Sequence, residues 1–136
     1  MKVENAVLPQ GAQLQHLLGL GGDQPIVMLN LLKFRDRAQY DEPGHPDISG
    51  REAYMLYGAA MKPLVEGKGG RMWFNATVDA LVIGEVEELW DVAAIMEYPS
   101  REAFVAIATS PEVQAIGIHR KAGLAGQLLI QCTSLA

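Results

Sequence analysis

The sequence lacks three features that would place it in a familiar class of protein. Its single cysteine, Cys132, excludes a disulfide within the chain, so nothing requires an oxidising compartment. The formal net charge is -5 and the basic residues form no run, which argues against nucleic acid or an anionic membrane surface as the main partner. The longest strongly apolar stretches, 26–32 and 80–83, are far shorter than the ~20 residues that span a bilayer.

The sequence also lacks a secretory signal, internal repeats and linkers. Only Lys2 is basic near the N-terminus, and Glu4 precedes any apolar stretch, so we expect a cytoplasmic protein. What is present is an ordinary globular composition, with 136 residues, 49% apolar and 20% charged. We therefore predict one domain over residues 1–136, made of an N-terminal helix and turn (1–24) and a core (25–136).

Hydrophobic periodicity predicts the elements of the first half of the chain. Leucines at helical spacing predict a short helix over residues 9–18, and a glycine-rich turn follows at 21–23. The run "PIVMLNLLKF", residues 25–34, is apolar on both alternating faces, which is typical of a buried strand. A polar loop over 36–49 then leads into a long amphipathic helix that begins at residue 51, with either Ser49 or Gly50 as its cap and Gly67 as its stop.

The second half of the chain predicts a hairpin, two short helices and a last strand. The hairpin strands are expected at 71–84 and 90–98, and Pro99 ends the second of them. Ser100 and Ser110 are each followed by an acid in the first helical turn, so both are predicted to cap helices. The predicted elements of this half lie at 71–84, 90–98, 100–108, from 110 onwards, and 127–133.

This order is β-α-β-β-α-β after an N-terminal helix, which is the ferredoxin-like α+β plan with a four-stranded antiparallel sheet. Two helices cover one face of such a sheet and leave the other bare. The strands at 25–34 and 127–133 carry apolar residues on both faces, so the bare face should not meet water. We therefore expect a homodimer in which two copies pair through this face.

Several segments closely resemble one known family. They are "PIVMLNLLKFR", "SGREAYMLYG", "GGR", "LVIGE", "WDVAAIMEYPSREAF", "SPEVQ" and "HRKAGLAGQLLI". Over residues 9–131 the chain resembles domain-of-unknown-function family 1330, which looks like a branch of the dimeric α+β barrel superfamily. The resemblance implies two ferredoxin-like sheets that form one barrel.

The resemblance also suggests a range of chemistries without selecting one. Relatives in the superfamily include cofactor-independent monooxygenases, small isomerases or lactone-handling enzymes, and haem-binding enzymes. Their catalytic residues find no matching motif in this sequence, so the resemblance assigns no role to any residue.

Polar and aromatic residues within the predicted elements are the candidates for a ligand site. Asn30 lies in an otherwise apolar strand, either as a structural clasp or as a pocket donor. Trp73 and Asn75 share the polar face of the strand at 71–84, which is either a solvated outer face or one wall of a cleft. Tyr54, on the sheet-facing side of its helix, serves either core packing or ligand binding.

His119 and Arg120 are the best candidates for chemistry. Histidine can exchange protons near neutral pH, and arginine can bind a carboxylate or an enolate. The alternative is that both cations lie near a helix C-terminus simply because the helix dipole favours them there.

Three other motifs predict no function. The metal-capable side chains of "YDEPGHPD", residues 40–47, match neither an EF-hand nor a zinc helix. The run "GLGGD", residues 19–23, precedes a strand rather than opening a helix, so it is no dinucleotide motif. Cys132 has no evident histidine partner and is expected to be inert. We expect no metal and no cofactor, with haem as a weaker option.

Two functional hypotheses follow. In the first, the protein binds a small, mostly apolar organic molecule, either acidic or neutral, between sheet and helices and acts as a cofactor-independent isomerase or oxygenase. Six residues would orient the ligand, with His119 as a proton carrier: Asn30, Tyr54, Trp73, Asn75, His119 and Arg120. In the second, the protein is a non-catalytic metabolite-binding or assembly module.

Overall fold

The computed structural model describes residues 2–20 and 23–135. Its elements are α1 (Gly11–Gly19), β1 (Ile26–Phe34), α2 (Gly50–Glu66), β2 (Arg71–Thr77), β3 (Val92–Tyr98), α3 (Arg101–Ala108), α4 (Pro111–Gly123) and β4 (Leu124–Cys132). This is the predicted element order. Gly21 and Gly22, which belong to the predicted turn and to the motif at 19–23, lie outside the described residues.

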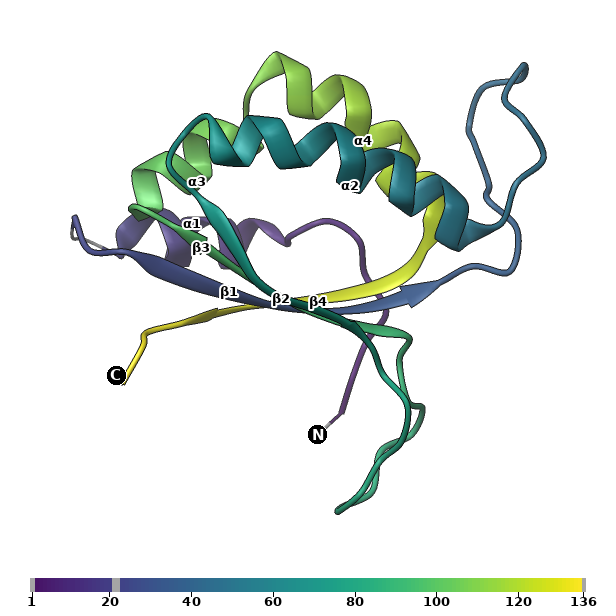
Figure 1. Ribbon diagram of the computed structural model, residues 1–136, viewed down its shortest axis with the longest axis horizontal. Helices are drawn as coiled ribbons and strands as arrows, with labels where there is room; N and C mark the ends of the chain where they lie inside the picture. The colour runs from purple at the N-terminus through teal and green to yellow at the C-terminus, as the bar shows by residue number, and fades with distance from the viewer. Residues whose placement is uncertain (1, 21–22, 136) are drawn as a thin grey trace.

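The four strands form one antiparallel sheet in the order β2-β3-β1-β4. β1 pairs with β3 on one side and with β4 on the other, and β2 pairs with β3. The helices α2, α3 and α4 lie on one side of this sheet, and the opposite side carries no helix (Figure 1). The predicted ferredoxin-like α+β fold is therefore confirmed.

Serine caps begin three of the helices: Ser100 and Ser110 as predicted, and Ser49 of the two predicted alternatives for α2. The Ser49 side chain accepts a hydrogen bond from the Glu52 N–H, and the Glu52 carboxylate accepts one from the Ser49 N–H. Ser100 caps α3 through the Ala103 N–H, and Ser110 caps α4. Each cap satisfies a backbone donor that the first helical turn leaves without a partner.

The hairpin differs from the prediction. β2 ends at Thr77 instead of reaching residue 84, and β3 begins at Val92 instead of 90. The intervening residues, 78–91, form a long arm that extends beyond the sheet, away from the helices (Figure 1). Val82 and Ile83 in this arm are each 89% exposed. Alternating apolar residues favour extended backbone, but here no neighbouring strand pairs with them.

β4 begins at Leu124, three residues earlier than predicted, because α4 leads into it without a loop. At this junction Gly123 of α4 lies against Gly50 of α2. A Cβ atom on Gly123 would overlap the Gly50 carbonyl oxygen. The Arg35 N–H donates to the Gly123 carbonyl at 2.8 Å, and the Gly50 N–H donates to the Arg35 carbonyl at 3.1 Å.

Apolar side chains form two clusters between the helices and the sheet. The first consists of Ile26, Met28, Val65, Tyr98, Ile107 and Val113. The second consists of Leu32, Val92 and Leu124, with Val7, Phe34 and Tyr54 packed against it. Asn30 lies between the two clusters along β1 and is 9% exposed.

Candidate functional site: a cleft between sheet and helices

An open cleft of about 2380 Å³ lies between the helices and the sheet. Its floor is the helix-facing side of the sheet, where paired residues form rows that cross all four strands. The first row is Met72, Met96, Met28 and Gln131. Methionine side chains are flexible and polarisable, so three of them side by side make an apolar wall that can adapt to a ligand.

The second row of the floor carries two asparagines. It consists of Asn75, Ala94, Asn30 and Leu129. Neighbouring strands lie ~4.8 Å apart, so the backbones of Asn75 and Asn30 are about 10 Å apart with only the small Ala94 side chain between them. The two amides therefore border one shared space.

A β-bulge places Asn75 in this row. Strict alternation puts Asn75 on the same face as Arg71 and Trp73. The register shifts between Met72 and Phe74, so Trp73 is an extra residue opposite β3. The bulge turns Asn75 to the face that Met72 occupies and leaves Arg71 on the other.

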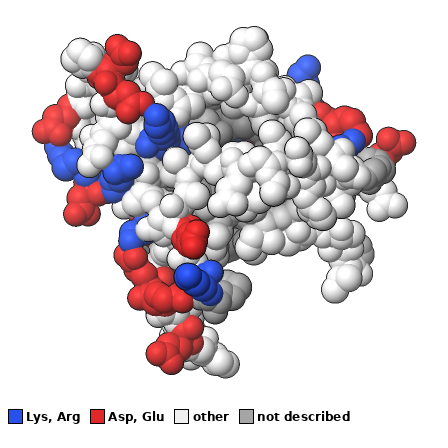
Figure 2. Space-filling model, turned by 180° about the vertical axis from the view of Figure 1, so that it is seen from behind, with Lys and Arg blue, Asp and Glu red and all other residues white. Residues whose placement is uncertain are grey.

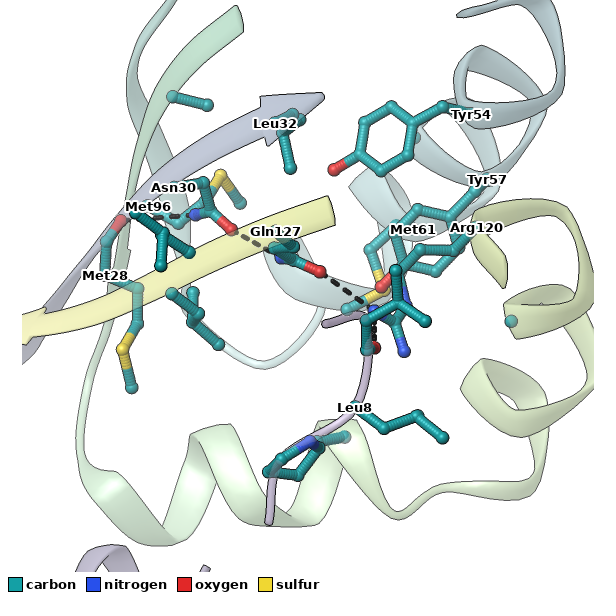
Figure 3. Close-up of a pocket in the computed structure, with 18 of the residues that line it drawn as sticks. Leu8, Met28, Asn30, Leu32, Tyr54, Tyr57, Met61, Met96, Arg120 and Gln127 are labelled. Carbon is teal, nitrogen blue, oxygen red and sulfur yellow. Dashed lines mark hydrogen bonds between the residues drawn. The ribbon is translucent and has the colours of Figure 1, made fainter. Parts of the chain in front are cut away.

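A chain of hydrogen bonds crosses one wall of the cleft (Figure 3). Arg120 Nη1 donates to the Val7 carbonyl at 2.6 Å and to Gln127 Oε1 at 2.8 Å. Gln127 Nε2 then donates to Asn30 Oδ1 at 2.9 Å. The Asn30 amide nitrogen makes one further contact, with the Met28 carbonyl at 3.4 Å.

Two tyrosines project from α2 toward the sheet (Figure 3). The rings of Tyr54 and Tyr57 lie 5.5 Å apart. Neither hydroxyl has a hydrogen-bond partner among the described residues. Burial raises the pKa of both phenols, although the Arg120 guanidinium opposes the rise. Both side chains are therefore neutral hydrogen-bond donors at neutral pH.

Buried tyrosine should make the protein sensitive to alkali. Burial raises the pKa of Tyr98 to about 12 from 10.0, with a contribution from Tyr57. The folded state thus holds the proton more tightly than the unfolded state. This contribution to stability is complete below pH 10 and is lost as the pH rises through 12.

We expect the melting temperature to fall between pH 10 and 12, and the Tyr98→Phe variant to fall less steeply. The difference corresponds to roughly 2 kcal/mol at pH 12. Thermal melts followed by circular dichroism at a series of pH values measure it. Curves of equal slope for the two proteins would contradict the assignment.

His119 lies outside the cleft, although its neighbour Arg120 lines it. Consecutive helical residues point in different directions, so both cannot reach one site. His119 Nδ1 shares a 2.7 Å hydrogen bond with the Tyr40 hydroxyl, and the His45 ring stacks on Tyr40 at 4.1 Å. His119 therefore ties α4 to the loop at 36–49, and the structure does not bring it to the predicted ligand.

The cleft brings together four of the six predicted site residues, and these are Asn30, Tyr54, Asn75 and Arg120. Trp73 is not among the lining residues. It is 45% exposed, and its ring lies 5.6 Å from the Arg71 guanidinium. The sequence analysis did not identify Gln127 as a site residue. Gln127 is the first residue of the predicted last strand, and only its spacing of two from Leu129 indicated that both face the same side of the sheet.

Charged groups lie mainly at the rim of the cleft, and the described residues offer no cluster of metal ligands. Figure 2 shows Lys, Arg, Asp and Glu gathered at both ends of the molecule and along the projection below, with the upper middle of that face largely uncharged. Across residues 2–20 and 23–135, no group of three or more His, Cys, Asp or Glu could hold a metal ion. Nor is any helix in this described part long and apolar enough to cross a membrane.

The chain belongs to the DUF1330 family, a domain of unknown function, which it matches over residues 44–131. The segment "PIVMLNLLKFR", which carries part of the resemblance noted above, lies before this match. A comparison with curated proteins gave no match.

Solved structures show the same fold. The chain is similar to RPA0582, a protein of unknown function from Rhodopseudomonas palustris, with 31% identity, a TM-score of 0.89, and coverage of 98% of this chain and 99% of that one. A dimeric ferredoxin-like protein of unknown function from Jannaschia sp. shares 15% identity over 81% and 99% of the two chains, with a TM-score of 0.52. SnoaB, a cofactor-independent oxygenase from Streptomyces nogalater, shares 11% identity over 83% and 95%, also with a TM-score of 0.52.

Proposed function

We propose that the protein binds a small, mostly apolar organic molecule in the cleft between the sheet and the helices. One observation carries this proposal: a wide cleft with a row of methionines on its floor also receives a few convergent polar groups (Figure 3). Ligand pockets combine apolar walls with a small number of placed donors and acceptors. Asn30, Tyr54 and Arg120 are those groups here.

The chemistry that these residues would support is proton transfer, isomerisation or oxygenation in which the substrate supplies the reactivity. Arg120 would stabilise negative charge that develops on a bound enol, and the Tyr54 hydroxyl would donate to an oxygen. SnoaB offers a precedent for oxygenation without a cofactor on this fold, and at 11% identity it offers no more than that.

A second candidate function is non-catalytic metabolite binding. The described carboxylates and imidazoles that border the cleft are all exposed residues at its rim, namely Glu4, His16, Asp41 and Glu66. The interior tyrosines are neutral because burial raises their pKa values. A buried general base is thus missing from the described interior, which favours binding alone unless the substrate is itself readily ionised.

A ligand panel tests the proposal. Native mass spectrometry of freshly purified protein reports any retained molecule, and a thermal-shift screen with aromatic and lactone compounds reports new ones. A ligand at about 100 times its Kd stabilises the folded state by about 2.7 kcal/mol, which raises the melting temperature by several degrees. Turnover of a hit then separates the two candidate functions.

Variants locate the binding. We expect Arg120→Met to weaken the hits at least tenfold, because it removes the cleft's interior cation. Arg37→Met is the matched control, since Arg37 lies outside the cleft and pairs with Asp47. If no compound in a broad panel raised the melting temperature, or if both variants bound equally well, the cleft would not be the binding site.

We further propose that the protein is a homodimer that pairs through the side of the sheet that carries no helix. One row on that side crosses all four strands and is wholly apolar: Phe74, Ile95, Leu29 and Ile130. Phe74 is 50% exposed and Ile130 is 40% exposed. The relative from Jannaschia sp. is described as dimeric, which supports the same use of this fold.

The arm at 78–91 supports the proposal that a second copy of the chain covers the bare side of the sheet. It extends on the same side as the bare face (Figure 1), and Leu81, Val82 and Ile83 expose apolar surface along it. A partner sheet packed on the bare face would bring its own surface within reach of this arm. Apolar side chains that no element of their own chain covers would then be buried.

A further inference from the structure

We propose that the side-chain nitrogen of Asn30 anchors a carbonyl oxygen of the ligand, and that Gln127 is the positioning residue that aims it. This inference rests on the proposed function of the cleft and deepens it by naming the ligand class. The class is an apolar ketone, quinone or lactone, and it excludes simple carboxylates.

The direction of the hydrogen-bond chain fixes which atom Asn30 offers. A guanidinium group has donors only, so the Gln127 atom that faces Arg120 at 2.8 Å must be its carbonyl oxygen. The amide nitrogen of Gln127 therefore faces Asn30 and donates to Oδ1 at 2.9 Å. Asn30 must then present its own nitrogen, with two hydrogens, on the side away from Gln127.

The Asn30 nitrogen has capacity to spare. The Met28 carbonyl takes one hydrogen at most, and at 3.4 Å that contact is long for a hydrogen bond. The second hydrogen has no acceptor among the described residues. Asn30 is 9% exposed and lines the cleft, so a ligand oxygen is the acceptor that this donor lacks.

The surroundings of Asn30 favour a neutral acceptor over a charged one. Its neighbours in the sheet are apolar, with Ala94 and Leu129 beside it and Met28 two residues before it. A carboxylate there would lose its hydration against apolar surface, whereas a carbonyl needs a single donor. Both hydrogens of Arg120 Nη1 are already bonded to protein oxygens, so this nitrogen offers no further donor to a carboxylate.

Gln127→Glu reverses the chain without changing its shape. A glutamate beside Arg120 is ionised and only accepts hydrogen bonds. Asn30 would have to turn its nitrogen toward residue 127, which places its oxygen in the cleft. The cleft would then repel a carbonyl oxygen while its apolar walls stayed intact.

Matched pairs of ketone and hydrocarbon test this. The probes are 1-tetralone with tetralin, and anthrone with 9,10-dihydroanthracene, titrated into the full chain and followed by NMR. We expect the natural protein to bind each ketone about tenfold more tightly than its hydrocarbon, as one buried hydrogen bond allows. Asn30→Leu and Gln127→Glu should each reduce that ratio to about one.

The outcomes separate the two proposals. If ketones and hydrocarbons bind the natural protein equally, or if Gln127→Glu keeps the tenfold preference, the anchor assignment is wrong although the cleft still binds ligands. If neither ketones nor hydrocarbons bind the natural protein, the anchor and the proposed function fail together.

Discussion

Replacing Ile95 with lysine is expected to convert the proposed homodimer into a monomer. Ile95 lies near the middle of the apolar row on the bare side of the sheet, paired with Phe74 on one strand and Leu29 on the other. A two-fold axis brings two copies of the new charge into one interface. Burying each unpaired ammonium costs several kcal/mol, so the dimer should weaken at least a thousandfold, or about 4 kcal/mol.

Light scattering coupled to size-exclusion chromatography at micromolar concentration measures the result. Leu56→Lys is the matched control, because Leu56 is 48% exposed on α2 and lines neither the cleft nor the sheet. The control should remain dimeric. A monomeric natural protein, or an Ile95→Lys variant of unchanged mass, would show that another surface covers the sheet or that none does.

Gly123→Ala is expected to lower the stability by about 3 kcal/mol, which is roughly 10 °C in melting temperature for a chain of this size. The added methyl group would overlap the backbone carbonyl of Gly50 and approach the Tyr54 nitrogen at 3.0 Å. Backbone atoms cannot swing aside as a flexible side chain can. α2 and α4 would have to separate at the junction that leads into β4.

Gly117→Ala on the same helix is the control, and it should act in the opposite direction. Nothing lies within 4 Å of a Cβ atom at Gly117. Alanine in a helix interior is favoured over glycine by up to about 1 kcal/mol. Thermal melts of the two variants should therefore shift in opposite directions. Equal shifts would mean that the close approach of the helices does not constrain the fold.

The sequence was sufficient to predict the fold because its local signals agree with each other. Ser100 and Ser110 begin helices in the structure as predicted, and so does Ser49 of the two predicted alternatives, because a side-chain oxygen at that point satisfies a free backbone N–H. The arm at 78–91 was not predicted, because alternating apolar residues indicate extended backbone but do not show whether a neighbouring strand pairs with it. Whether such a segment joins the sheet depends on what it can pack against.

The site was predictable only in part, for reasons of geometry. Asn30 was found because an amide in an apolar strand demands a partner. The bulge that turns Asn75 toward the cleft leaves no mark on a pattern of alternating residues. His119 and Arg120 share one segment of sequence, but a helix turns its consecutive side chains apart and only Arg120 lines the cleft. Gln127 could be recognised only from the structure, in which its side chain links Arg120 to Asn30.

The two tryptophans have different surroundings, so their fluorescence reports two different processes. Trp90 is 9% exposed and lies against Gly126 at the end of the sheet, so its emission follows unfolding. Trp73 lies at the bulge and is 45% exposed, so solvent or a neighbouring molecule determines the polarity around its ring. Emission spectra of the Trp73→Phe and Trp90→Phe proteins would therefore resolve association and denaturation without any added dye.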